Sequence, residues 1–170
     1  MAVLDNQPDN PNFLSQSGFR LDLTRMPSVN FWVTAASLPT VDLGFIDVGT
    51  PFVRLPTPGV NITFGDFNVT FKVDEDMRNY TEMLDWFYQL GFPDTFNQYT
   101  AGRISPDTQG YSDGTLMIMS SKYNPNIEVT FEDMFPILMS QLDFTYDASD
   151  IEYLTCTVTF RYKKFTLKKL

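Results

Sequence analysis

The sequence predicts an α+β domain that is mainly β, with antiparallel sheets forming a sandwich or barrel and one helix packed on the flank. Three observations predict this fold. Segments in which apolar and polar residues alternate recur along the 170 residues, and a single segment has helical spacing. Hydrophobic residues make up 43% of the chain and aromatic residues 15%, enough for a packed core. We expect one domain at residues 17–170, preceded by a flexible N-terminal arm at residues 1–16.

The first two predicted strands lie directly after this arm. Residues Phe19 to Thr24 alternate apolar and polar side chains, which is typical of a half-buried strand. Residues Asn30 to Ala36 predict a strand that is apolar on both faces, because Phe31 and Val33 alternate with Trp32. One face would meet the core and the other a partner, so Trp32 is a candidate interface residue.

The stretch between Leu38 and Gly59 contains four prolines and predicts an extended excursion from the body. We expect one short strand near Phe45 to Val48. The excursion lacks the apolar density to pack alone, so we expect the Val41 to Pro58 segment to become ordered against a partner. It is the candidate subunit-contacting hairpin, and its candidate interface residues are Phe45, Ile46, Phe52 and Val53.

Strand patterns resume at Val60 to Phe64 and at Phe67 to Val73, and we expect the tight turn Gly65-Asp66 to join them. A helix follows, which Asp76 would cap and which Gly91 and Pro93 would end. Its apolar residues recur at intervals of three and four: Met77, Tyr80, Met83, Leu84, Phe87 and Leu90.

The remaining residues predict a loop and then further antiparallel strands. Asp94 to Gly114 is rich in small polar residues and predicts a mobile surface loop, to which we assign no function. Strands are expected at Thr115 to Ser121, Ile127 to Phe131 and Leu142 to Tyr146, with a break around Phe135-Pro136. The final strand, Tyr153 to Tyr162, alternates without interruption and should be the longest and central one.

Catalytic chemistry has little support in the sequence. Histidine is absent, which removes the usual general base and the commonest transition-metal ligand. The acidic cluster Asp74 to Asp76 precedes the predicted helix, where carboxylates stabilise the helix N-terminus. The single cysteine, Cys156, falls in a strand pattern and is expected to be an inert buried residue. We therefore expect no catalytic residue, cofactor or metal site.

The charge of the chain argues against loose association with nucleic acid or anionic lipid. Twelve basic and twenty-one acidic residues give a formal charge of −9. The clustered basic residues lie at the C-terminus and are expected to form a solvated tail: Arg161, Lys163, Lys164, Lys168 and Lys169. No apolar run approaches the ~20 residues of a membrane span, and the N-terminus is not signal-like, so neither membrane insertion nor export is expected.

Two segments resemble the tail-tube family of contractile phages. From Phe67 to Trp86 a strand runs through an acidic turn into a helix that ends in the pair Asp85-Trp86, as in that family. Residues Leu142 to Phe160 resemble its closing hairpin, an acidic turn followed by a long strand of alternating Thr and apolar residues. Ser37-Leu38-Pro39 is similar to its early strand-to-loop junction.

This resemblance implies a tail-tube subunit in which the sheet continues around a hexameric ring and stacked rings form a channel for DNA. It further implies a virion protein that is assembled in the host cytoplasm beside sheath, tape measure or baseplate hub proteins. An acidic channel would repel phosphate, so DNA would pass without specific binding. The proline-rich segment Pro51 to Pro58 and the loop Asp94 to Gly114 depart from the family pattern.

Those departures leave open whether the chain is the main tube subunit or a specialised ring at the baseplate or neck. Two other classes also remain open. A virion decoration protein would be a monomer or trimer rather than a larger ring. A small hydrolase would need carboxylates converging in one pocket, and the absence of histidine and of a nucleophile motif makes it the weakest alternative.

Overall fold

The computed structural model describes residues 11–91, 97, 110–146 and 152–170. Two helices and eleven strands have described bounds. In chain order they are β1 (Phe19–Leu23), α1 (Pro27–Trp32), β2 (Val33–Ala36), β3 (Val41–Asp42), β4 (Phe45–Gly49), β5 (Arg54–Pro58), β6 (Thr63–Phe64), β7 (Phe67–Lys72), α2 (Arg78–Gly91), β8 (Ser112–Met119), β9 (Pro125–Met139), β10 (Thr155–Arg161) and β11 (Lys164–Lys169).

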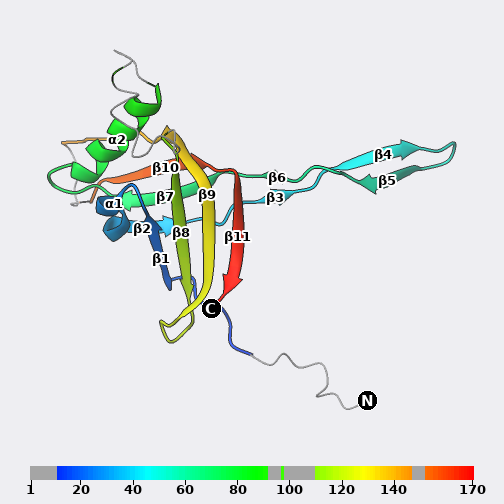
Figure 1. Cartoon of the computed structure of the whole chain (residues 1–170), viewed down its shortest axis with the longest axis horizontal. Coiled ribbons are helices and arrows are strands. Elements are labelled where there is room, and N and C mark those ends of the chain that lie inside the picture. The colour runs from blue at the N-terminus through cyan, green and yellow to red at the C-terminus, as the bar shows by residue number, and fades with distance from the viewer. Residues whose placement is uncertain (1–10, 92–96, 98–109, 147–151) are drawn as a thin grey trace.

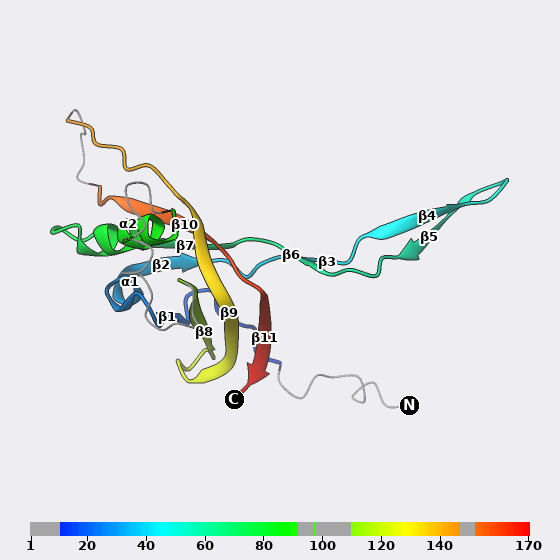
Figure 2. The same ribbon diagram turned by 45° about the horizontal axis from the view of Figure 1, so that its top comes forward.

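The body of the molecule is an antiparallel sheet bent around the long strand β9. The strand order is β1-β8-β9-β10-β7-β2, and β11 also pairs with β9. The first part of β9 pairs with β8 and β11, whereas its last part pairs with β10. Figures 1 and 2 show the two halves of the sheet running in different directions on either side of this bend. In the described residues the path does not close into a barrel, so the body is an open, sandwich-like form of the predicted fold.

The core lies between the two halves of the sheet and under helix α2. Phe67 of β7 stacks on Phe131 of β9, with ring centroids 4.3 Å apart. Trp86 of α2 packs on Phe160 of β10 at 5.9 Å. The other fully enclosed large side chains alternate along the strands and recur on the helix: Phe71, Leu21, Leu23, Met83, Met134, Val29, Val69 and Val129. The prediction of a mainly β fold with a helix packed on it is confirmed.

Four predicted elements are confirmed in type and place. β1 and β7 match the alternating segments closely, and α2 begins one residue after Met77 and ends at Gly91. β10 is central, as predicted, because it pairs with both β7 and β9. The prediction that it would also be the longest strand is wrong, since β10 has 7 residues and β9 has 15. Asp76 forms an ion pair with Arg78 at 3.5 Å. The buried Asn79 instead ties the start of the helix to the preceding strand, where it donates to Lys72 O and accepts from Asp74 N.

The predicted strand at Asn30 to Ala36 is wrong over its first half. Helix α1 occupies Pro27–Trp32, and only Val33–Ala36 are extended. A proline in the first turn of a helix costs no hydrogen bond and its φ angle already suits the helix. Asn30 then fixes the short helix to β1, since its Oδ1 accepts from Leu23 N at 2.8 Å.

The expected hairpin turn at Gly65-Asp66 is also wrong. β6 pairs with β3 and β7 pairs with β2, so the chain passes through these two residues without reversing. Gly65 is needed for a different reason. A Cβ atom there would lie 2.3 Å from Thr40 Oγ1 on the adjacent segment, just before β3.

Three further predictions about the C-terminal half fail. The expected break at Phe135-Pro136 is absent, since β9 continues through it as the longest strand, with 15 residues, and a register shift opposite Phe160 accommodates Pro136. The segment Leu142 to Tyr146 is not a strand. The C-terminal residues form strand β11 rather than a solvated tail, because Phe165 packs against the core beside β9.

Parts of two other predictions fall outside the described residues. β8 begins at Ser112, inside the expected loop Asp94 to Gly114, and most of the rest of that loop lies outside the described residues. Of the N-terminal arm, residues 11–16 are described and exposed, and its order against a partner stays a prediction.

Candidate assembly interface

A thin two-stranded ribbon leaves the body and extends well beyond it. We name residues 41–64, from β3 to β6, the β-arm. β3 pairs with β6 near the body, and β4 pairs with β5 at the far end. In both Figure 1 and Figure 2 the β-arm projects away from the rest of the chain. All residues of β4 and β5 are exposed, so this part of the ribbon has no packing partner in the described part of its own subunit.

The far end of the β-arm has two different faces, because directly paired residues of an antiparallel ribbon lie on the same side. Ile46 pairs with Thr57 and Val48 with Leu55, and the turn continues this side with Val53, which accepts from Thr50 N. We name this side the aliphatic face. The opposite side pairs Phe45 with Pro58, Asp47 with Pro56 and Gly49 with Arg54, and it therefore carries two charges. An uncharged aliphatic face without cover is typical of a protein contact.

The prolines of β5 decide how the β-arm can make that contact. Pro56 and Pro58 are two residues apart, so their nitrogen atoms both point to the outer edge of the ribbon rather than toward β4. The ribbon keeps its cross-strand hydrogen bonds, but its outer edge lacks two donors. Addition of another strand at this edge is disfavoured. The β-arm is therefore expected to contact a partner through one of its two faces rather than through its edge.

The structure brings four of the five predicted interface residues together. Phe45 and Ile46 lie on β4, 71% and 60% exposed, and Phe52 and Val53 lie in the turn that follows, with Phe52 99% exposed. They divide between the two faces and the tip, which the sequence did not indicate. Val48 and Leu55, the cross-strand pair that completes the aliphatic face, were not among the predicted interface residues. Alternation of Ile46 with Val48 was a usable signal, whereas prolines on both sides obscured Leu55.

Trp32 is the fifth predicted residue, and it lies apart from the β-arm. It ends helix α1 on the body, 39% exposed, and not on the doubly apolar strand that was the reason for choosing it. Its ring contacts the more exposed ring of Phe31 edge to face at 5.1 Å. The pair forms a separate aromatic patch.

Two observations on the described residues bear on catalysis and metal binding. Burial raises the pKa of the Cys156 thiol, which disfavours the reactive thiolate. No group of three or more His, Cys, Asp or Glu side chains within this part of the chain is close enough to hold a metal ion. Over the same residues, no helix has the length and apolar character to cross a membrane.

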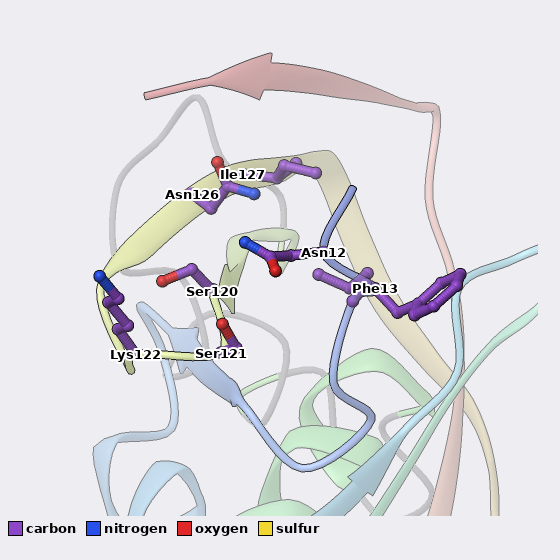
Figure 3. A pocket seen from close by; sticks show the side chains of 8 residues that line it. Asn12, Phe13, Ser120, Ser121, Lys122, Asn126 and Ile127 are labelled. Carbon is purple, nitrogen blue, oxygen red and sulfur yellow. The ribbon is translucent and has the colours of Figure 1, made fainter. Parts of the chain in front are cut away.

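One groove, of about 300 Å³, lies between the N-terminal segment and the β8–β9 turn. Figure 3 shows Asn12 and Phe13 on one side of it and Ser120, Ser121 and Lys122 on the other. The Phe13 side chain is 93% exposed. The groove is open and holds one charged side chain, Lys122, which is itself exposed.

The comparisons with known proteins decide the family. Residues 7–168 match the model of a family described as phage tail tube protein. The chain belongs to this family. As a tail component it is a structural protein of the virion, and its family relatives are structural rather than enzymatic.

Similar individual proteins include several that end tubes. The tail tube terminator protein of Enterobacteria phage T4 is 26% identical over 174 residues, covering 96% of this chain and 90% of that protein. A chain in the structure of the tube-terminating cap of the anti-feeding prophage has a similar fold, with a TM-score of 0.66 at 12% identity and complete coverage of both chains. A chain of the sheath–tube complex of an extracellular contractile injection system gives 0.64 at 13% identity, covering 100% of this chain and 99% of that chain.

Proposed function

We propose that this chain forms a ring of six subunits that ends the tail tube of a contractile phage. The observation that carries the proposal is the match to the T4 tail tube terminator, which spans almost the whole length of both proteins. A chain of the tube-terminating cap of the anti-feeding prophage is also matched from end to end. The specialised ring therefore has more support than the main tube subunit.

The aliphatic face of the β-arm is the proposed contact with a neighbouring copy of the chain. Ile46, Val48 and Leu55 are exposed in the isolated subunit, and covering them would remove apolar surface from water. The charged face with Asp47 and Arg54 would stay toward solvent. The exposed pair Phe31 and Trp32 is a second proposed contact, on the body.

The ring would conduct DNA without gripping it. The chain carries a formal charge of −9, and affinity for a duplex comes largely from cations that neutralise phosphates. Five of the twelve basic residues lie between Arg161 and Lys169. Three of them are already in ion pairs: Arg161 with Asp66, Lys163 with Asp133 and Lys164 with Glu132. Other proposed partners are the main tube subunit and the sheath, with assembly in the host cytoplasm.

A second candidate function is the main tube subunit itself. The likeness to a chain of a sheath–tube complex supports it, with a TM-score of 0.64 against 0.66 for the terminating cap. The two functions differ in what the purified chain forms alone. A terminator should stop at single rings, whereas a tube subunit should stack into long tubes.

The experiment is electron microscopy of the purified chain, alone and mixed with main tube subunits that are polymerising. We expect single six-membered rings alone, and shorter tubes in the mixture. Long tubes from the chain alone would assign it to the main tube. Monomers or trimers at every concentration would contradict a ring and favour a decoration protein.

A charge on the aliphatic face tests the proposed contact. Ile46→Asp should abolish rings, because a carboxylate would be buried without a partner, and the melting temperature of the body should not change. The matched control is Asp47→Asn, which changes the next residue, on the opposite face, and should still form rings. Rings formed equally by both variants would remove the aliphatic face from the interface.

A further inference from the structure

The β-arm is the outer part of one long ribbon that begins inside the body. Ala36 pairs with Val69 in the sheet, and Val41 pairs with Phe64 in the same alignment further out. Between these pairs the two chains stay connected, since Ser37 N donates to Asn68 O and Gly65 N donates to Thr40 O. The direction of the β-arm is therefore determined where the ribbon leaves the sheet, at Gly65 and Asp66.

Two side chains hold the ribbon at this point: Arg161, the last residue of β10, and Tyr162, which follows it. Arg161 Nε lies 2.5 Å from Asp66 Oδ1, which is itself shielded from solvent. The Tyr162 hydroxyl donates to Gly65 O at 2.9 Å. The neighbouring residues Arg161 and Tyr162 thus bind the neighbouring residues Asp66 and Gly65. Arg161 does so through an ion pair, and Tyr162 through a hydrogen bond to the backbone.

Aromatic rings support the same junction from the side of the core. The Phe64 ring lies 5.5 Å from that of Phe165 and 6.1 Å from that of Tyr162. Tyr162 also packs edge to face on the buried Phe131 at 5.1 Å. Phe64 is the last residue of the β-arm, so the β-arm ends in a side chain that packs, through Tyr162 and Phe165, against the core.

The contacts differ in kind from those that stabilise the body. Both members of the ion pair are partly exposed, with 56% of the Arg161 and 37% of the Asp66 side chain accessible, and such pairs contribute little to folding. Their geometric effect is larger, because a small rotation at the root displaces the far end of a long ribbon. The cluster is therefore better suited to orienting the β-arm than to stabilising the fold.

We infer that Asp66, Arg161 and Tyr162 are positioning residues that fix the angle between the β-arm and the body, so that its aliphatic face meets a neighbouring copy in one orientation. The orientation itself is a property of the isolated subunit. Its consequence for assembly rests on the proposed function of the aliphatic face.

The test measures the angle and the assembly separately. Spin labels are attached at Asp47→Cys on the β-arm and Lys122→Cys on the body, in a Cys156→Ala background. Labelled chains are diluted into unlabelled ones, so that pulsed dipolar spectroscopy reports the distance within one subunit. We expect one narrow distance distribution for the parent and a broad one after Asp66→Ala combined with Tyr162→Phe. Equal widths would overturn the positioning role, whether or not rings form.

Exchanging the two charges between Asp66 and Arg161 distinguishes a positioning role from a merely structural one. Asp66→Arg and Arg161→Asp should each broaden the distance distribution and reduce ring yield at least tenfold, and the double variant should restore both. Melting temperatures should stay within a few degrees throughout. If the double variant gives a narrow distance distribution but forms no rings, the positioning role of these residues stands and the proposed contact through the aliphatic face is rejected. A failure of the double variant to narrow the distances would reject the pairing of the two residues.

Discussion

Asn79 is the fully buried polar side chain in the described part of the body, and it shows how one residue fixes the start of an element. Its amide donates to Lys72 O at 2.8 Å and accepts from Asp74 N at 3.2 Å, so it spans the connection from β7 to α2. The spacing of the apolar residues predicted the helix, but it gave no sign that Asn79 would replace Asp76 as the residue that anchors it. Polar anchors depend on the three-dimensional path of the backbone, which periodicity does not contain.

Asn79→Ala should lower the free energy of unfolding by about 1–3 kcal/mol, because the partly buried Lys72 carbonyl and Asp74 amide would each lose a partner. Urea unfolding followed by the fluorescence of Trp86 measures the change. Asp76→Ala, at an exposed residue three positions earlier, is the control and should shift stability by less than about 0.5 kcal/mol. A loss for Asp76→Ala equal to that for Asn79→Ala would contradict the assigned anchor.

Cys156 should resist thiol reagents while the protein is folded. Its side chain is fully buried between β7 and β9, and burial raises its pKa, so less thiolate is present at neutral pH than in the unfolded chain. A raised pKa in the folded state stabilises the fold below the ordinary thiol pKa and loses that effect as the pH rises through the folded value. Alkylation monitored by mass spectrometry should proceed at the rate of unfolding. Rapid modification of folded protein at pH 8 would show that this strand is accessible.

At the scale of elements, alternation predicted the body strands well and failed where the chain changes partners. β9 continues through Pro136 because it changes from pairing with β8 and β11 to pairing with β10 at that point. Proline there was expected to end the strand, and long-range pairing overrode this local preference. The C-terminal basic segment forms β11 for a similar reason. Its pairing with β9 and the packing of Phe165 against the core override the local preference of a charged segment for solvent.

The excursion Val41 to Pro58 was predicted with one short strand near Phe45 to Val48, and β5 was missed because two of its five residues are prolines. The irregular joint between the β3–β6 and β4–β5 parts of the β-arm could not be predicted from the sequence either. Two residues separate the paired segments on the outgoing chain and four on the returning chain, between Asp42↔Thr63 and Phe45↔Pro58. Gly59 lies in this joint and its amide donates to Gly44 O.

Gly59→Ala should disturb the joint and leave the body intact. A Cβ atom at this position would lie 2.3 Å from Leu43 O, a backbone atom that cannot move alone, so the outer ribbon must shift. We expect ring yield to fall severalfold in sizing chromatography, with an unchanged melting temperature. Gly49→Ala, where a Cβ atom meets nothing within 4 Å, is the matched control. Normal ring yield for Gly59→Ala would show that the joint tolerates another geometry.

At the scale of the whole molecule, the fold and the family follow from the sequence and are confirmed, whereas the interface follows in part. Composition and the absence of histidine predicted a structural protein, and the resemblance of two segments predicted the tail-tube family. Four exposed apolar residues of the β-arm were found because the proline-rich stretch around them lacks the apolar density to pack alone. Trp32 was chosen for a strand that is a helix, so its place in the interface stays a prediction.

Assembled rings should not bind duplex DNA measurably, even at low ionic strength, where screening is weakest and any attraction largest. The expected reason is the net charge of −9, with Lys163 and Lys164 already engaged by acidic residues. Fluorescence anisotropy of labelled DNA over a salt series measures this. Tight binding that weakens steeply with added salt would show a basic surface on the ring and contradict passive passage.

The most direct test of the central claim is native mass spectrometry of the purified chain, supported by images of the same sample. We expect one dominant species of six copies of the 19.5 kDa subunit, with no series of stacked rings at higher mass. The Ile46→Asp variant should appear as the monomer in the same conditions. A ladder of multiples of six would assign the chain to the main tube, and a parent protein that remains monomeric or trimeric at every concentration would contradict the ring itself.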